Sequence, residues 1–111
     1  MKKVIKKSSN DNVATALESI NSSEKVQIIS DKNENLGEIE ALESIPFGNK
    51  IALVHIKDSD EIIKCGFSIG ITTKEISKGK LVHVHNVESQ RVDIPAMAKK
   101  EIIKQMGIKV D

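Results

Sequence analysis

Short runs of β-branched and other apolar residues, separated every few positions by turn-forming residues, limit the fold of this chain more than any other feature. The intervening segments are rich in Gly, Pro, Asn, Asp and Ser, which favour turns. Many short strands at this spacing are typical of an all-β or mainly β domain. The predicted strands cover residues 26–29, 36–45, 51–56, 61–64, 67–71 and 81–85, with a shorter one at 4–5.

Two helices are predicted outside this strand-rich region. Polar residues 8–12 offer N-cap side chains, and the apolar positions 13, 16, 17 and 20 then follow helical spacing, which predicts a short helix over 13–20. Pro95 and Gly107 bracket a second predicted helix over 95–106. No internal repeat or linker is apparent, so we expect one β domain over 1–91 and a helical tail of the same domain over 92–111.

Charge and composition narrow the functional classes. The 111 residues carry 17 basic and 16 acidic side chains, a net charge of +1, and the aromatic residues are Phe47 and Phe67. Nucleic-acid binding leans on uncompensated basic clusters and on aromatic stacking, so we expect no nucleic-acid partner. Cys65 is the single cysteine, which rules out an intrachain disulfide and favours a reducing cytoplasm. No run approaches the roughly 18 apolar residues of a membrane span, so no membrane association is expected.

His83 and His85 form the sharpest local feature. On a strand over 81–85 the period of two would project both imidazoles to one face. There they can share a metal ion or an anionic substrate, and Asn86 adds a donor and an acceptor. The alternative is a pair of polar residues on the solvent face of an edge strand. His55 lies in an apolar strand, which favours a packed or edge histidine over a ligand.

Three further cations are candidates for binding a carboxylate. Lys50 follows the turn at 45–50, Lys64 precedes Gly66, and Arg91 is the only arginine of the chain. Arginine is a planar bidentate donor suited to carboxylates. Taken alone, each of the two lysines is better explained as a residue flanking a strand.

Taken together, these segments resemble a known family. The runs DNVATAL (11–17), IPFGNKIAL (45–53), IKCGFSIG (63–70) and VHVHNVESQR (82–91), with Ile76 and Gly79 between the last two, occur in the same order in the N-terminal domain of altronate dehydratases. Galactarate dehydratase and the small subunit of sulfolactate sulfo-lyase are similar. The resemblance covers about residues 4–91 and implies a SAF-type domain with a β-clip fold.

The activity that this resemblance implies is a metal-assisted lyase reaction on a sugar acid. The chain would be the small subunit of an altronate dehydratase-like hydro-lyase, removing water from an aldonate or aldarate together with a large catalytic subunit. The implied cofactor is a divalent metal, Fe(II) or else Mn(II), shared with that subunit. We therefore expect the isolated chain to be inactive. The alternatives are the small subunit of sulfolactate sulfo-lyase and a non-catalytic module that binds a sugar acid or a partner; a homo-oligomer also stays open.

The family motif also assigns roles to individual residues. His83 and His85 match its His-x-His-Asn motif and are the implied catalytic pair and metal ligands. Two departures from the motif are Asn49, where the family has histidine, and Cys65, where it has tyrosine. The implied substrate-binding residues are Asn86, Ser89, Arg91, Lys50 and Lys64.

Overall fold

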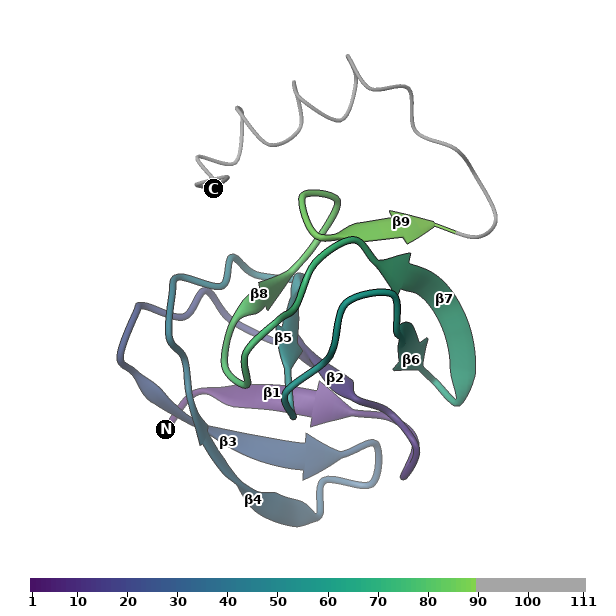
Figure 1. Ribbon diagram of the computed structural model, residues 1–111. Coiled ribbons are helices and arrows are strands. Elements are labelled where there is room, and N and C mark those ends of the chain that lie inside the picture. The colour runs from purple at the N-terminus through teal and green to yellow at the C-terminus, as the bar shows by residue number, and fades with distance from the viewer. Residues whose placement is uncertain (90–111) are drawn as a thin grey trace.

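Every regular element of the described chain is a β-strand (Figure 1). The computed structural model describes residues 1–89, which confirms a mainly β domain. The strands are β1 (Lys3–Lys6), β2 (Val13–Ala16), β3 (Lys25–Ser30), β4 (Asn35–Glu40), β5 (Lys50–Ala52), β6 (Glu61–Lys64), β7 (Phe67–Thr72), β8 (Leu81–Val82) and β9 (Val87–Ser89).

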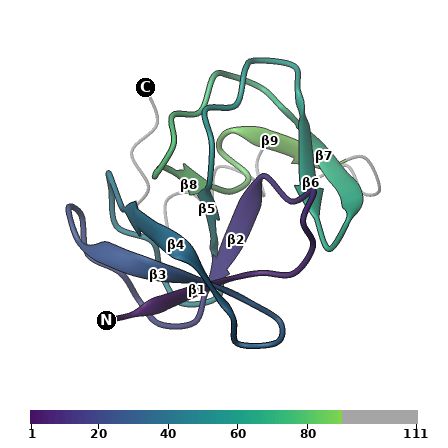
Figure 2. The same ribbon diagram turned by 90° about the horizontal axis from the view of Figure 1, so that it is seen from below.

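The strands form two sheets. A six-stranded sheet has the order β4-β3-β1-β2-β5-β8, and a three-stranded sheet has the order β6-β7-β9. Neighbouring strands are antiparallel except β1 and β3, which pair in parallel. In both views β2, β5 and β8 lie between the group β1, β3 and β4 and the smaller sheet (Figures 1 and 2).

The central strands β2, β5 and β8 separate two hydrophobic cores. Because side chains alternate along a strand, one face of each of these strands lies in each core. Ala14, Ile51 and Leu81 belong to the first core, which β1, β3 and β4 complete. Their neighbours Val13, Ala52 and Val82 belong to the second core, where Ile62 of β6 joins them. Lys50 precedes Ile51, so it lies on the same face of β5 as Ala52, beside the second core.

A turn unit of constant length occurs four times in the chain. Each unit starts with a small buried residue, has a buried isoleucine at its fifth position and a positive-φ residue at its eighth, and ends with a buried valine or isoleucine. Because only small or glycine-like residues tolerate positive φ, Ser and Gly alternate at the eighth position. The units are residues 16–26, 41–51, 52–62 and 72–82; their fifth positions are Ile20, Ile45, Ile56 and Ile76, and their eighth positions are Ser23, Gly48, Ser59 and Gly79.

The four units associate in two pairs through reciprocal backbone hydrogen bonds. Ile20 and Ile45 exchange two N–H···O bonds of 2.9 Å, and Ile56 and Ile76 exchange two of 2.8 Å. The positive-φ residue of each unit also donates its N–H to the first residue of its partner unit, as Gly48 does to Ala16 at 2.9 Å. The expectation that the chain has no internal repeat is therefore wrong.

The helix predicted over 13–20 is also wrong. Residues 13–16 form β2, which pairs with β1 on one side and β5 on the other. The spacing from Ala16 to Ile20 looked helical, but it is the spacing of the turn unit, and it returns from Ala41 to Ile45 and from Ala52 to Ile56. Within the described residues, therefore, the short N-terminal helix of the expected fold is absent.

Several predicted strands are shorter than expected. The strands predicted over 36–45 and 51–56 end at Glu40 and Ala52, where turn units begin. The strand predicted over 81–85 ends at Val82, and β9 was not predicted. The predicted helix over 95–106 and the tail over 92–111 lie outside the described residues.

Candidate functional site

His83 and His85 lie in a tight turn between β8 and β9, not on a strand. The strand prediction that placed both imidazoles on one face is therefore wrong, because the ladder of β8 with β5 stops at the pair Lys50–Val82. Period-two alternation does not extend past that point, so the two histidines have different surroundings.

Asn86 holds this turn in shape. It is 3% exposed, and its side-chain Oδ1 accepts a hydrogen bond of 3.0 Å from the His83 N–H while its Nδ2 donates to the Leu81 carbonyl at 2.8 Å. Its own N–H closes the turn on the His83 carbonyl at 3.0 Å. Both ends of the amide thus bind the backbone of the same segment. The substrate-binding role expected for Asn86 stays a prediction, and its observed contacts are with the turn that carries both histidines.

His83, Lys50 and Lys64 form what we call the basic cluster. Lys50 is the cross-strand partner of Val82, the residue before His83, so β5 and β8 bring the two side chains to the same end of the sheet. Lys64 enters from β6 in the second sheet. The structure thus brings together three of the residues that the sequence singled out, from segments far apart in the chain.

The charges of the basic cluster are poorly compensated. Burial lowers the pKa of the Lys50 ammonium, and the charge of Lys64 lowers this pKa further. Burial likewise lowers the pKa of His83, and the nearby Lys50 charge adds to the effect. The His83 Nε2 atom is buried and, among the described residues, lacks a hydrogen-bond partner. Groups of this kind are stabilised by an anion, since a negative charge favours the protonated form of both.

Asp11 fixes the hairpin that delivers Lys64. Cys65 and Gly66, both at positive φ, form its two-residue tip. The Asp11 carboxylate is buried and accepts the N–H groups of both tip residues at 2.9 Å, as well as that of Ser8 at 3.1 Å. The next residue, Asn12, binds the backbone of β6 at both ends of its amide. The polar residues at 8–12 thus do satisfy backbone N–H groups, but those of a distant hairpin and not those of a helix.

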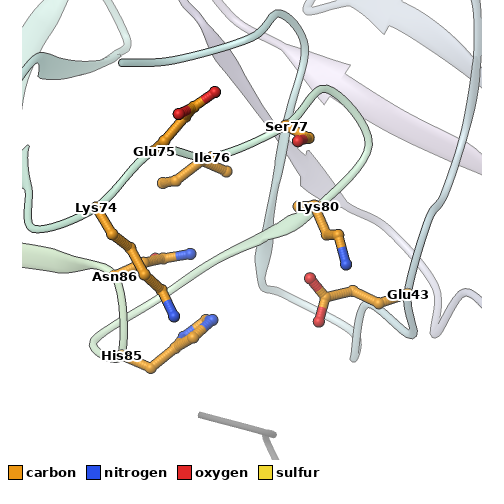
Figure 3. A pocket seen from close by; sticks show the side chains of 8 residues that line it. All are labelled: Glu43, Lys74, Glu75, Ile76, Ser77, Lys80, His85 and Asn86. Carbon is orange, nitrogen blue, oxygen red and sulfur yellow. The ribbon is translucent and has the colours of Figure 1, made fainter. Parts of the chain in front are cut away.

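His85 lines a pocket of about 380 Å³ that does not include His83 (Figure 3). The basic cluster does not contribute to its walls. Besides His85 and Asn86, the lining includes Glu43 from the β4–β5 loop and Lys74, Ser77 and Lys80 from the segment between β7 and β8. These four residues were not predicted from the sequence, and no motif or spacing singles them out there.

The remaining predicted residues have simpler places. Asn49, at the family's histidine position, donates its side-chain N–H to the carbonyls of Pro46 and Phe47 at 3.3 Å and so supports the turn before Lys50. His55 is half exposed and pairs with Glu75 at 2.7 Å. Because β5 ends at Ala52, His55 lies in the third turn unit, and the apolar strand expected to carry it does not extend that far. Ser89 ends β9, and Arg91 lies outside the described residues.

The described residues do not fit a metal site by themselves. Within residues 1–89 no three His, Cys, Asp or Glu side chains come close enough together to hold an ion. Metal ligation by His83 and His85 therefore stays a prediction, and it would need ligands from elsewhere. Over the same residues, no helix is long and apolar enough to cross a membrane.

The fold and the basic cluster define a small β domain in which two lysines and a partly buried imidazole lie together. The family profile described as the altronate/galactarate dehydratase SAF domain matches residues 2–90. The chain belongs to this family, which confirms the resemblance found in the sequence.

Two relatives share much of this sequence. The altronate dehydratase of Bacillus subtilis is 39% identical over 94 residues, which are 85% of this chain and 18% of that protein. The (2R)-sulfolactate sulfo-lyase subunit alpha of Chromohalobacter salexigens is 35% identical over 54 residues, 49% of this chain and 57% of that subunit. The chain thus spans less than a fifth of the first relative and little more than half of the second.

Proposed function

We propose that this chain is the small, acid-binding subunit of a sugar-acid dehydratase and acts together with a larger catalytic chain. The observation that carries the proposal is the basic cluster, in which neither Lys50 nor His83 forms an ion pair with an acid of the described residues. A substrate carboxylate supplies the missing charge. The names of the two relatives, both lyases, support this reaction class.

The residues of the cluster suit two steps of such a reaction. Loss of water next to a carboxylate needs a group that binds the acid and a group that moves a proton. Lys50 and Lys64 are suited to bind the carboxylate. Burial and the Lys50 charge lower the pKa of His83, which favours its neutral form, and the buried nitrogen of that form can accept a proton or a hydroxyl hydrogen bond.

The larger chain is needed because these groups make an incomplete site. The described residues bring no three metal-binding side chains together, so we propose that the divalent ion takes most of its ligands from the partner. The sulfo-lyase relative bears the name of a subunit, which supports a division of the enzyme between chains. We derive no step through the metal.

Reconstitution tests this function. The chain is expressed alone and together with a candidate large dehydratase-type chain from the same genome, and altronate and galactarate are assayed for release of the dehydrated keto acid. We expect turnover from the complex only, with a large loss in Lys50→Gln and little change in the control Lys25→Gln. Turnover by the isolated chain, or full activity of the large chain without it, contradicts the proposal.

One alternative has a specific observation in its favour. The relative that is itself a separate subunit is the sulfolactate sulfo-lyase subunit alpha, so the acid could be (2R)-sulfolactate and the leaving group sulfite. The same complex is therefore assayed for sulfite release. Binding of sugar acids without turnover in any complex would instead assign the chain to a non-catalytic binding module.

A further inference from the structure

Phe47 is an aromatic side chain at a place where the other turn units have polar residues. It occupies the seventh position of the second unit and is 68% exposed. The seventh positions of the other three units are also exposed, and they hold Ser22, Asp58 and Lys78. The turn itself therefore does not require an aromatic ring at this position. Since aromatic residues are enriched in protein interfaces, a ring that the fold does not need is a candidate for contact with another protein.

The backbone that carries Phe47 is held by hydrogen bonds on both sides. Its N–H donates to the Ser19 hydroxyl oxygen at 3.1 Å, and its carbonyl accepts the side-chain N–H of Asn49 at 3.3 Å. The next residue, Gly48, donates its N–H to the Ala16 carbonyl at 2.9 Å. Because a preorganised segment loses little conformational freedom on binding, a side chain on this turn is suited to anchor a partner.

Leu17 extends the apolar surface beside Phe47. The residue before Leu17 accepts the Gly48 N–H, so the two backbone segments lie side by side, and the Leu17 side chain is 41% exposed. Leu42 is the equivalent residue of the second unit and is 44% exposed, but its carbonyl accepts the hydroxyl group of Ser22 at 3.3 Å. One end of the paired units thus has two exposed apolar side chains, and the equivalent end has a leucine beside a serine. We call Leu17 and Phe47 the apolar patch.

The apolar patch borders the basic cluster. Lys50 lies three residues after Phe47, and its cross-strand partner Thr15 lies two residues before Leu17. Strands β2 and β5, which carry Thr15 and Lys50, are neighbours in the larger sheet (Figures 1 and 2). A chain that adds further groups to the site at Lys50 therefore comes within reach of both apolar side chains.

We propose that the apolar patch is a docking surface for the larger catalytic chain and that Phe47 is its anchor. This inference rests on the proposed function and adds to it the place where the two chains meet. The 94 aligned residues make up 18% of the altronate dehydratase, so in that relative such a domain accompanies a much longer polypeptide. The matching surface of the larger chain is an apolar recess that receives the Phe47 ring, since burial of apolar surface favours association.

The test is a titration of the candidate large chain with this chain, followed by turnover of altronate or galactarate. Phe47→Ser should raise the concentration of this chain needed for half-maximal turnover by about tenfold or more, and Leu17→Ser should raise it less. Turnover at a saturating concentration should stay close to the parent value in both variants, because neither residue belongs to the basic cluster. The control Leu42→Ser removes a similarly exposed leucine from the equivalent position and should leave the titration unchanged.

The outcomes separate this inference from the proposed function. An unchanged midpoint in Phe47→Ser, or equal effects of Leu17→Ser and Leu42→Ser, would overturn the docking surface and leave the lyase function standing. No turnover with the parent chain would contradict the proposed function, on which the inference rests. Light scattering of the chain alone is a further check, since a dimer that Phe47→Ser converts into a monomer would assign the patch to a second copy of this chain. The amide spectrum of each variant shows whether it is folded.

Discussion

Lys50 differs from every residue at the same position of the other turn units. The tenth position is Lys25 in the first unit, Glu61 in the third and Leu81 in the fourth. Lys25 and Glu61 are exposed and Leu81 is a buried core residue, whereas Lys50 is a charged group that is partly buried. The four turn units can therefore be compared with one another. Of their four tenth positions, the one occupied by Lys50 holds a partly buried charge, which is costly to desolvate.

Removal of this charge should raise the pKa of His83. In Lys50→Gln the repulsion between the ammonium and the imidazolium is lost, so His83 titrates closer to its ordinary pKa of about 6.5. NMR titration of the imidazole resonances measures the shift, and Lys25→Gln is the matched control. An unchanged His83 pKa in Lys50→Gln would show that the two groups do not interact.

The same shift sets a pH dependence of stability. The pKa of His83 is lower in the folded state than in the unfolded state, so the unfolded chain binds the proton more tightly. The stability contribution of neutral His83 is therefore present above pH about 6.5 and is lost as the pH falls toward the folded-state pKa. Urea denaturation between neutral and mildly acidic pH should show this loss, and Lys50→Gln should reduce it. Equal pH dependence in both proteins would contradict the assignment.

For the candidate site, the sequence predicted which residues to consider but not how they are grouped in space. Lys50, Lys64 and His83 were named as candidates, and the structure brings these three together. Their separation from His85 could not be predicted, because it depends on where β8 ends. That end is set by the Asn86 side chain, which binds the backbone of Leu81 and His83 across the turn.

At the scale of elements, the β6–β7 hairpin depends on a carboxylate far away in the sequence. Asp11→Asn replaces an acceptor oxygen by an amide, which cannot accept all three backbone N–H groups. We expect a loss of about 2 kcal/mol in the free energy of unfolding. The amides of Cys65 and Gly66 should also exchange faster with solvent.

Hydrogen exchange followed by NMR measures this effect, with the exposed Asp31→Asn as control. This hairpin positions Lys64, whose charge lowers the pKa of Lys50. When the hairpin is less firmly held in Asp11→Asn, the pKa of Lys50 should therefore rise toward the ordinary lysine value. Full protection of Cys65 and Gly66 in Asp11→Asn would refute the role given to this carboxylate.

Two equivalent glycines should respond differently to the same substitution. Gly48 and Gly79 occupy the eighth position of their units at φ of 81° and 91°. A Cβ at Gly48 meets open space, so Gly48→Ala should cost only the backbone strain, about 1 kcal/mol. A Cβ at Gly79 would lie 2.4 Å from the Glu40 carbonyl oxygen, so Gly79→Ala should cost about 3 kcal/mol. Urea denaturation of both variants tests the difference, and equal losses would contradict it.

The elements themselves were predictable in part. Turn residues marked the ends of β3, β6 and β7 well, because Asn, Asp, Ser and Gly favour turns regardless of the tertiary context. The helix over 13–20 was wrong because apolar residues four apart serve two structures, a helical face and a turn unit. The sequence does contain a signal that distinguishes the helical face from the turn unit, because ALESI occurs at both 16–20 and 41–45. The second copy directly precedes Pro46, and the residue before a proline disfavours helical geometry.

For the whole molecule, the shared strands predict one cooperative unfolding transition. Since β2, β5 and β8 each contribute side chains to both cores, neither core can lose them without exposing the other. Ile62→Ala, in the second core, should lower the free energy of unfolding by about 3 kcal/mol.

Methyl NMR signals from both cores should disappear at the same urea concentration in this variant and in the parent chain. Ile45 reports on the first core and Ile76 on the second. Survival of the Ile45 signal after the Ile76 signal is lost would show that the two cores unfold separately.

The family and the mainly β class of residues 1–89 followed from the sequence, and the two-core arrangement did not. Consecutive residues such as Ile51 and Ala52, whose side chains point to opposite faces of the strand, are both fully buried. The sequence of this strand therefore shows no polar face from which its orientation relative to a core could be inferred. Such a run is compatible with any strand enclosed on both sides.

The paired turn units have a consequence for association. Each pair meets as the halves of a symmetric homodimer do, with the same groups exchanged in both directions, as Ile20 and Ile45 do. Isologous contacts of this kind are closed: both partners use the same groups, so no hydrogen-bonding group of the contact remains for a further copy to bind. This chain thus contains, within one polypeptide, the kind of self-complementary interface that other proteins form between subunits. The edge strands of its two described sheets are β4 and β8 in the larger sheet and β6 and β9 in the smaller one.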